Sequence, residues 1–262
     1  MAISERLGRP KEVLDHSSFL ITIDGSTTAG KRVLGEKLAE QYNLTLLNTG
    51  STIRALALLA IEQNLVKTDD MNIVGLPADF AERIVYFYDN LPEKFRIEKP
   101  IEGSHTARIM LGKREMRGEL LTYPKQKAIE NLSSVIAATP LIRERMYELW
   151  RDAVSRFDGA VVIGRRTGVD LFPKAPVKLY LFASPEASAQ YRVVHDPQAD
   201  KDYSNETLYI RERDGRDREM GLLERSPDAL IIDTSSYITD REGFSKLNNR
   251  VAAHISERYD LR

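Results

Sequence analysis

Residues 19–35 read FLITIDGSTTAGKRVLG, and they join a short apolar run to a helical pattern through a glycine-rich turn. The run at 19–23 has the length and the β-branched content of a buried strand. The turn from Gly25 to Lys31 has the Gly-x-x-x-x-Gly-Lys spacing of a phosphate-binding loop. Such a loop directs backbone N–H groups and the positive end of a helix dipole at an anion. We therefore expect phosphate groups to bind here; the alternative is a glycine-rich turn whose Lys31 is merely solvated.

The helix predicted after the turn supports the loop interpretation. One apolar face at helical spacing is formed by Val33, Leu34, Leu38 and Tyr42. A strand before and a helix after are the context in which this loop binds phosphate. The position after Lys31 usually carries a Ser or Thr hydroxyl for magnesium, but Arg32 stands there in this chain. The sequence therefore predicts a phosphate site with a weakened magnesium site.

The composition limits the classes of function. With 38 Lys and Arg against 39 Asp and Glu, the net charge of −1 gives no overall field that attracts nucleic acid or anionic lipid. The chain has no Cys, which excludes disulfides, thiol nucleophiles and cysteine metal sites. We predict that the protein side chains do not form a metal site, because the four histidines are scattered along the sequence. They are His16, His105, His195 and His254.

No part of the sequence has the pattern of a membrane segment. Residues 1–18 mix basic and acidic side chains without an apolar core, so we expect an N-terminal extension rather than a signal peptide or an anchor. No other run approaches the roughly 18 uninterrupted apolar residues of a spanning helix. We expect a soluble, cytoplasmic protein that binds neither membranes nor nucleic acid, and whose protein partners are unknown.

Apolar runs separated by helical patterns predict a parallel sheet with helices on both faces, which is an α/β fold. The five predicted strands are 19–23, 44–47, 160–163, 177–182 and 229–232. The clearest helix lies around Trp150, which we expect at the edge of an apolar face formed by Ile142, Met146, Leu149, Ala153 and Phe157.

Two stretches interrupt the alternation of strands and helices. Residues 65–130 do not continue the alternating pattern. Within them, the segments TARIML and REMRGEL flank Gly112-Lys113 as the two arms of a small antiparallel hairpin would. Residues 195–225 are densely charged, as in a solvated helix with i,i+4 ion pairs. We interpret the first stretch as an inserted subdomain.

Arginines follow the predicted strands at the edge of the sheet where ligands of open α/β folds bind. Arg54 follows the second strand, and Arg165 and Arg166 follow the third. The charged stretch adds Arg211, Arg213, Arg216 and Arg218, together with Asp214 and Asp217. In a nearly neutral protein, arginines that converge on a phosphate loop predict a substrate with several phosphates, because guanidinium groups match phosphate oxygens bidentately.

At these motifs the sequence resembles the bacterial cytidylate kinases, a family of P-loop nucleoside monophosphate kinases. The resemblance runs from about Leu20 to the C-terminus, and this chain is a divergent member. The matching blocks are ITIDGSTTAGK, LLNTGSTIRALAL, SVIAATPLIR (134–143), GRRTGVDLFPKAPVKLYLFASPE, RDGRDR (213–218) and PDALIIDTSS.

The resemblance implies a P-loop NTPase fold with a five-stranded parallel sheet. It divides the chain into an extension at 1–18 and a kinase-like domain at 19–262. Within that domain, 19–64 and 131–262 form the core, 65–130 form the inserted monophosphate-binding subdomain, and about 195–225 form an arginine-rich lid.

The resemblance also implies transfer of the ATP γ-phosphoryl group to CMP or dCMP in pyrimidine nucleotide metabolism, with ATP and magnesium as cofactors. The ATP phosphates would lie over Gly25, Ser26, Thr27, Thr28, Ala29, Gly30, Lys31 and Arg32, with lid arginines such as Arg192 and Arg211. The monophosphate would be held by Thr49, Arg54, Ser134, Arg143, Arg165, Arg213 and Asp217. The groups expected to act in catalysis are Lys31, Arg165 and Arg213. No general base is needed, since an ionised phosphate oxygen is the nucleophile.

Several positions depart from the family pattern. Arg32-Val33 replace Gly-Thr after the loop lysine, Thr28 replaces a loop glycine, and Ile53 replaces a tyrosine. The family has an Asp on each side of the Gly-Arg pair that matches Gly164-Arg165, and this chain has Ile163 and Arg166 at those two positions. Met220 replaces the last arginine of the lid motif. We expect Arg32 and Arg166 to carry part of the charge that magnesium otherwise offsets.

These departures leave two alternatives to a cytidylate kinase activity. One is a P-loop phosphotransferase with a changed acceptor, and the other is a nucleotide-binding module with little turnover. For single residues the structural alternative also stands. Thr49 and Ser134 could be turn or helix residues, Arg54 and Arg143 could be surface charges, and 211–218 could be a solvated helix face.

Overall fold

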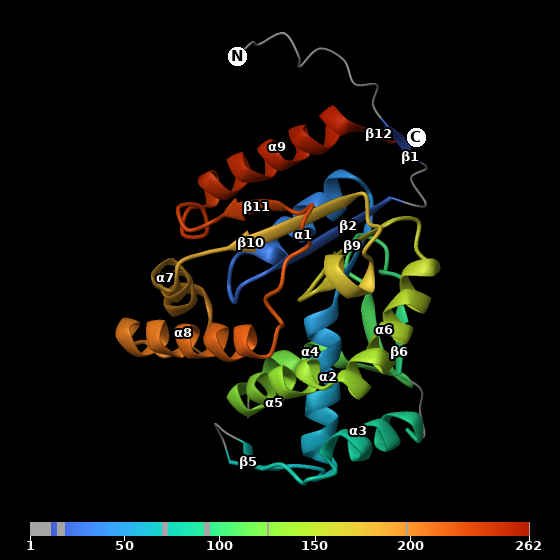
Figure 1. The fold of residues 1–262 in the computed structure, drawn as a ribbon, viewed down its shortest axis with the longest axis vertical. Coiled ribbons are helices and arrows are strands. Elements are labelled where there is room, and N and C mark those ends of the chain that lie inside the picture. The colour runs from blue at the N-terminus through green and yellow to red at the C-terminus, as the bar shows by residue number, and fades with distance from the viewer. Residues whose placement is uncertain are drawn as a thin grey trace.

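Five parallel strands form the central sheet of the protein (Figure 1). Their order is β11-β10-β2-β9-β3, and every neighbouring pair is parallel. The strands are β2 (Leu20–Gly25), β3 (Thr45–Asn48), β9 (Ala160–Ile163), β10 (Val177–Phe182) and β11 (Leu230–Asp233). All five predicted strands are confirmed, and β9 and β10 agree with the prediction at both ends.

The structure is a computed structural model that describes residues 12–14, 19–69, 73–91, 95–124, 126–197 and 199–261. The predicted extension at 1–18 lies outside these residues except for β1 (Glu12–Leu14), which pairs in parallel with β12 (Tyr259–Leu261). Within the described ranges, no helix is both long enough and apolar enough to cross a bilayer.

Strand β9 shows why helices cover both faces of the sheet. Its side chains alternate, so Val161 and Ile163 pack in one hydrophobic cluster, while Ala160 and Val162 pack in another. The first cluster includes residues of α1 (Lys31–Gln41) and α9 (Arg241–Arg258). The second includes residues of α2 (Thr49–Glu62), α5 (Gln126–Ala138) and α6 (Pro140–Ser155).

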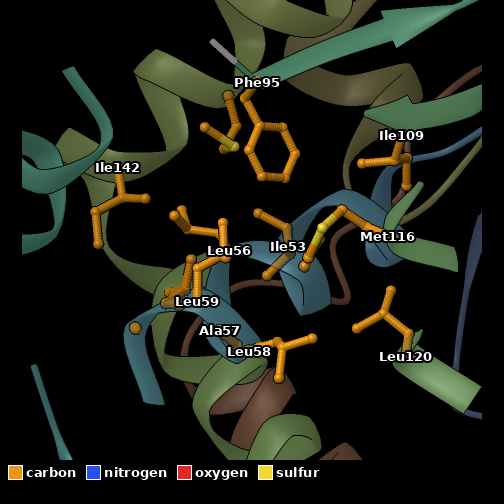
Figure 2. Packing of buried hydrophobic residues seen from close by; sticks show 14 of the residues in the cluster. Ile53, Leu56, Ala57, Leu58, Leu59, Phe95, Ile109, Met116, Leu120 and Ile142 are labelled. Carbon is orange, nitrogen blue, oxygen red and sulfur yellow. The ribbon is translucent and has the colours of Figure 1, made fainter. Parts of the chain in front are cut away.

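Helix α2 forms the centre of the second cluster (Figure 2). Its side chains are apolar around most of the helix, and Ile53, Leu56 and Leu59 are all buried. Residues from the predicted insertion, such as Phe95 and Met116, pack against them in the same cluster. The insertion therefore shares its hydrophobic core with the main domain.

The predicted insertion contains two small antiparallel sheets and two helices. Its elements are β4 (Lys67–Thr68), β5 (Ile73–Gly75), α3 (Phe80–Asp89), β6 (Phe95–Glu98), β7 (Arg108–Leu111), β8 (Arg114–Glu115) and α4 (Met116–Thr122). The boundary placed after 130 falls inside α5, so a continuous helix crosses it.

The predicted hairpin around Gly112-Lys113 is present, but its second arm is short. Gly112 has a φ of 58°, and Leu111 pairs with Arg114 across the turn. From Met116 the chain is helical, because Met116 and Leu120 stand one helical turn apart and are both buried.

The prediction for Trp150 was wrong. Trp150 is only 5% exposed, whereas Leu149 is partly buried. Helix α3 and strand β6 of the insertion pack on α6, and Trp150 belongs to the same hydrophobic cluster as Phe95 of β6.

The stretch predicted as a lid, about 195–225, contains helix α8 (Tyr203–Glu219), which packs against the preceding helix α7 (Pro185–His195) (Figure 1). Side chains cap both helices: Ser184 accepts from the backbone N–H of Ala187, and Asp202 accepts from those of Ser204 and Asn205. A solvated face was the alternative interpretation of this charged stretch, but Glu206, Asp214 and Asp217 on α8 are buried.

Candidate active site

The predicted phosphate loop connects the end of β2 to the start of α1. Gly25 has a φ of 141°, and a Cβ atom there would lie 1.7 Å from the carbonyl oxygen of Leu181. Only glycine allows β10 to approach the loop this closely. Thr28 has a φ of 56°, so it keeps a left-handed conformation although it carries a β-branched side chain. Within the loop, Ser26 accepts a hydrogen bond from the N–H of Ala183, and the Ala29 carbonyl accepts one from Thr234.

Lys31 lies against the carbonyl groups of the loop. Its Nζ donates a 2.9 Å hydrogen bond to the Gly25 oxygen and a second to the Ser26 oxygen. Burial of the ammonium group, reinforced by the nearby Arg165, lowers the pKa of Lys31 to about 7. Lys31 can therefore change its charge near neutral pH.

Asp24, at the end of the strand, fixes the segment that follows β9. Its two carboxylate oxygens accept hydrogen bonds from the N–H of Thr167 at 2.8 Å, the hydroxyl of Thr167 at 2.9 Å and the N–H of Gly168 at 2.8 Å. Burial raises the pKa of Asp24, and these hydrogen bonds oppose that effect. The interactions anchor the π-helical turn η3 (Thr167–Leu171) beside the loop.

Arg165 joins the loop to the lid. Its Nη2 donates a 2.8 Å hydrogen bond to Oγ1 of Thr27, and its Nη1 pairs with the buried Asp217 of α8. Asp214, one turn earlier on α8, accepts a 3.0 Å hydrogen bond from the backbone N–H of Thr27. The loop, the turn after β9 and α8 therefore meet at one point.

A second group of charges surrounds the carboxylate of Glu130 on α5. Arg213 of α8 lies 3.1 Å from it, Arg54 of α2 lies 3.6 Å away, and Arg192 of α7 lies 3.9 Å away. Tyr209 donates a 2.7 Å hydrogen bond to the same carboxylate. Burial alone would raise the pKa of Glu130, but the three arginines hold it at about 2. We call these five residues the Glu130 cluster.

Arg192 therefore lies with Arg54 and Arg213 in the Glu130 cluster. Its guanidinium group also pairs with Glu206 at 2.6 Å and Asp196 at 3.1 Å. Its contact with the ATP phosphates stays a prediction.

The other predicted substrate residues lie on the elements around this cluster. Thr49, at the start of α2, donates a 3.1 Å hydrogen bond to the Ile163 carbonyl, and a Cβ atom on Gly164 would lie 2.1 Å from its hydroxyl. Arg143 on α6 donates a 2.9 Å hydrogen bond to the Ala138 carbonyl. Ser134 is half-buried on α5, one helical turn after Glu130.

Arg32 and Arg166 each pair with carboxylates of this chain. Arg32 is 58% exposed and lies 3.0 Å from Glu36 on the same helix. Arg166 makes two contacts with Asp170, at 2.6 and 3.0 Å, pairs with Glu224 and donates to the Gly221 carbonyl. Their predicted role in neutralising a polyphosphate stays a prediction.

Sequence reasoning missed Glu130 and Tyr209 and gave Asp214 no role. Glu130 reads as an ordinary polar position of an amphipathic helix, and its only signal is its place one turn before Ser134. Tyr209 likewise stands one turn before Arg213.

The loop fits a polyphosphate, because it presents the N–H of Thr27 together with Lys31 and Arg165 at one place. The fit to magnesium is poorer. Arg32 stands at the hydroxyl position, and both oxygens of Asp24 accept hydrogen bonds. Across the described ranges, no group of three His, Asp or Glu side chains could hold a metal ion.

Comparisons with known proteins agree with this geometry. The sequence profile of the cytidylate kinase family matches residues 21–247. The cytidylate kinase of Aeromonas salmonicida is 32% identical over 225 residues, covering 84% of this chain and 89% of that protein. The cytidylate kinase of Methylococcus capsulatus is 31% identical over 225 residues, covering 84% of this chain and 91% of that protein.

Among solved structures, shikimate kinase from Bacteroides thetaiotaomicron aligns with a TM-score of 0.43 at 10% identity, covering 91% of this chain and 98% of that chain. The assignment of fold rests on the strand order and the loop between β2 and α1. On the profile match and the identity to its relatives, the chain belongs to the cytidylate kinase family of phosphotransferases.

Proposed function

We propose that this chain is a nucleoside monophosphate kinase that transfers the γ-phosphoryl group of ATP to CMP or dCMP. The observation that carries the proposal is the position of Arg165, which contacts Thr27 in the loop and Asp217 on α8. The loop side would bind the donor phosphates and the α8 side the acceptor, so one guanidinium group would lie between them. The choice of acceptor is supported by the similarity to the cytidylate kinases of Aeromonas salmonicida and Methylococcus capsulatus.

In this proposal the loop binds the donor. The backbone N–H groups of residues 25–30 and the ammonium group of Lys31 would contact the ATP phosphates, with Arg32 and Arg192 as further cationic contacts. The N–H of Thr27, which now donates to Asp214, is one of these donors.

The acceptor would bind between α2, α5, α6 and α8. Arg54 and Arg213 face the same carboxylate from two different helices, which is the arrangement expected for groups that share one phosphate. The full set proposed to hold the acceptor is Thr49, Arg54, Ser134, Arg143, Arg165, Arg213 and Asp217.

The residues would act by positioning and by neutralising charge. The attacking phosphate oxygen is already ionised, so no side chain has to remove a proton. Lys31, Arg165 and Arg213 would offset the negative charge that spreads over the transferred group. Helix α8, which Arg165 connects to the loop through Asp217, would keep water away from the reacting phosphates.

Magnesium, when bound with ATP, supplies further neutralisation of the phosphate oxygens. The described residues offer no carboxylate cluster for it, so the phosphates themselves and water would provide most of its ligands. The loop hydroxyl groups that could contribute are those of Ser26, Thr27 and Thr28.

A coupled assay with ATP and a panel of nucleoside monophosphates tests the proposal. We expect phosphorylation of CMP and dCMP, and in Arg213→Ala a loss of kcat/KM of about tenfold to a hundredfold, the effect of one lost charge-assisted contact. Arg250→Ala, an exposed arginine on α9, serves as the matched control and should retain activity.

Two outcomes would contradict the proposal. Preferred turnover of another acceptor would identify a phosphotransferase with a changed substrate. Binding of ATP without turnover of any monophosphate would identify a nucleotide-binding module.

A further inference from the structure

The carboxylate of Glu130 lies where three arginines from three helices converge. Arg54, Arg192 and Arg213 approach it from α2, α7 and α8, at 3.6, 3.9 and 3.1 Å. These contacts connect the sheet-covering helix α2 to α7 and α8. One anionic group therefore holds together elements that are far apart in sequence.

The arginines differ in how much they depend on Glu130. Arg192 has two other carboxylate partners, Glu206 and Asp196. Among the residues that the structure describes, Arg54 and Arg213 each have one carboxylate within ion-pair distance, and for both it is Glu130. Arg213 is largely buried and therefore needs an anionic partner, whereas the side chain of Arg54 is 39% exposed. Glu130 is the partner of both arginines, which the proposed function assigns to the acceptor.

A carboxylate and a phosphate place the same demands on a guanidinium group. Both present oxygens that accept two parallel N–H bonds, and both are anionic under assay conditions. Glu130 is ionised throughout the neutral range because the three arginines keep its pKa at about 2. Arg213 donates a 3.1 Å hydrogen bond to Glu130 through Nη1, and Arg54 faces the same carboxylate at 3.6 Å, so a phosphate that binds both guanidinium groups competes with this carboxylate for them.

We propose that Glu130 is an internal competitor for the phosphate group of the acceptor and thereby determines which acceptors bind. An incoming phosphate must displace the Glu130 carboxylate from Arg54 and Arg213. A dianionic phosphate monoester does this more readily than a monoanionic group, because it carries more charge and more acceptor oxygens. The inference rests on the proposed function, since it takes Arg54 and Arg213 as acceptor-binding groups.

The hydrogen bond from Tyr209 gives the displacement a second consequence. Tyr209 and Arg213 lie one turn apart on α8, and both hold Glu130 in this structure, at 2.7 and 3.1 Å. When the carboxylate leaves, the Tyr209 hydroxyl becomes available to the phosphate, so the competitor and the ligand use the same donors.

Calorimetric binding to wild-type protein and to Glu130→Gln tests the inference. Gln keeps the size of the side chain and removes its charge. The ligands are CMP, inorganic phosphate in the presence of saturating ADP, and ATP. We expect CMP and phosphate to bind about tenfold more tightly to Glu130→Gln, because the phosphate then no longer has to displace a charge-assisted contact from the arginines. ATP affinity should stay within about twofold of wild type.

Two further variants control for stability. Glu130→Asp retains the charge but shortens the side chain, so it should tighten CMP binding less than Glu130→Gln does. Glu98→Gln removes the partner of Arg108, at 2.7 Å in the β6–β7 sheet, and should leave all three affinities unchanged.

The outcomes separate the inference from the proposed function. If Glu130 only supports the fold, Glu130→Gln will weaken CMP binding or leave it unchanged, which overturns the inference while wild-type CMP turnover stands. If phosphate binds more tightly to Glu130→Gln but CMP binds to neither protein, the competitor role stands and the proposed acceptor is wrong.

Discussion

The guanidinium group of Arg165 donates a 2.8 Å hydrogen bond to the hydroxyl of Thr27 and, through its other terminal nitrogen, pairs with Asp217 of α8. Asp214 reinforces the connection by accepting a hydrogen bond from the N–H of Thr27. The lid helix is therefore attached to the phosphate-binding loop through the side chain proposed to act on the transferred group. Any change at Arg165 should alter both stability and activity.

We expect Arg165→Ala to destabilise the protein strongly. The side chain of Asp217 is 2% exposed, and leaving a buried carboxylate without its partner costs roughly 3–5 kcal/mol. Thermal unfolding measures the effect. In the double variant with Asp217→Asn much of the lost stability should return, because the unpaired charge is gone, whereas turnover should not return. Equal stability of the single and double variants would contradict the assigned pair.

The titration of Lys31 predicts an effect of pH on stability. Its pKa is about 7 in the folded protein, against 10.5 for an ordinary lysine. Between these values the unfolded chain binds a proton that the folded protein does not, so the stability should rise with pH across that window. Below pH 7 the cost of burying the charged group applies in full. Urea unfolding at several pH values measures this slope, and Lys31→Met should remove it.

The same titration should affect the binding of ATP in the opposite direction. Phosphates attract the protonated form of Lys31, so ATP affinity should fall as the pH rises above about 7, and binding should take up protons. Calorimetry in buffers of different ionisation enthalpy measures both effects. Lys31→Arg stays charged over this range, and its profile therefore reports the titration of the nucleotide alone. Identical profiles for the two proteins would show that Lys31 does not titrate on binding.

The sequence was sufficient to predict the sheet, because each strand is a short segment rich in apolar residues. Strands buried on both faces need no alternation, and β9 and β10 match their predicted bounds. The pattern failed where distant elements decide burial. Trp150 is buried in a cluster that includes residues of the insertion, and the periodicity of α6 does not encode that packing.

Charge patterns were harder to interpret than apolar ones. The run on α8 resembles a solvated helix, yet Glu206 and Asp217 are buried because Arg192 and Arg165 reach them from other elements. Glu130 gave no local signal for the same reason. The motif resemblance predicts Arg54 and Arg213 as site residues, and the structure adds that the Glu130 carboxylate lies within ion-pair distance of both.

Thr28→Gly should stabilise the loop. A left-handed conformation costs a residue with a side chain roughly 1–2 kcal/mol, and Thr28 has a φ of 56°. Greater freedom of glycine in the unfolded chain offsets part of this gain. We expect a rise in Tm of about 2 °C, on the order of 0.5–1 kcal/mol for a chain of this size. Thr28→Ala keeps the strained backbone and is the control. A fall in Tm for Thr28→Gly would mean that the side chain of Thr28 contributes more than its conformation costs.

Arg166→Asp, which restores an acidic residue of the family pattern, should destabilise the protein. Arg166 pairs with Asp170 and Glu224, so the substitution would bring three carboxylates together and break the contact to the Gly221 carbonyl. A loss of about 1–3 kcal/mol is expected by thermal unfolding. Arg166→Gln removes the charge without the repulsion and should lose less stability. Equal stability of Arg166→Asp and wild type would mean that these ion pairs do not form in solution.

Binding of ATP should depend less on magnesium than the family pattern implies. Arg32 stands where a hydroxyl for the metal is usual, and its ion pair with Glu36 is exposed and therefore easily exchanged for a phosphate. Calorimetry should detect ATP binding in EDTA, and the double variant Arg32→Gly with Val33→Thr should make binding more dependent on magnesium.

Glu36→Gln is the matched control. Because it frees Arg32 from its partner on α1, it should strengthen ATP binding in EDTA if that guanidinium group reaches the phosphates. Unchanged affinity in Glu36→Gln, together with no binding of ATP to wild type in EDTA, would show that Arg32 remains a surface charge and that the metal is still required.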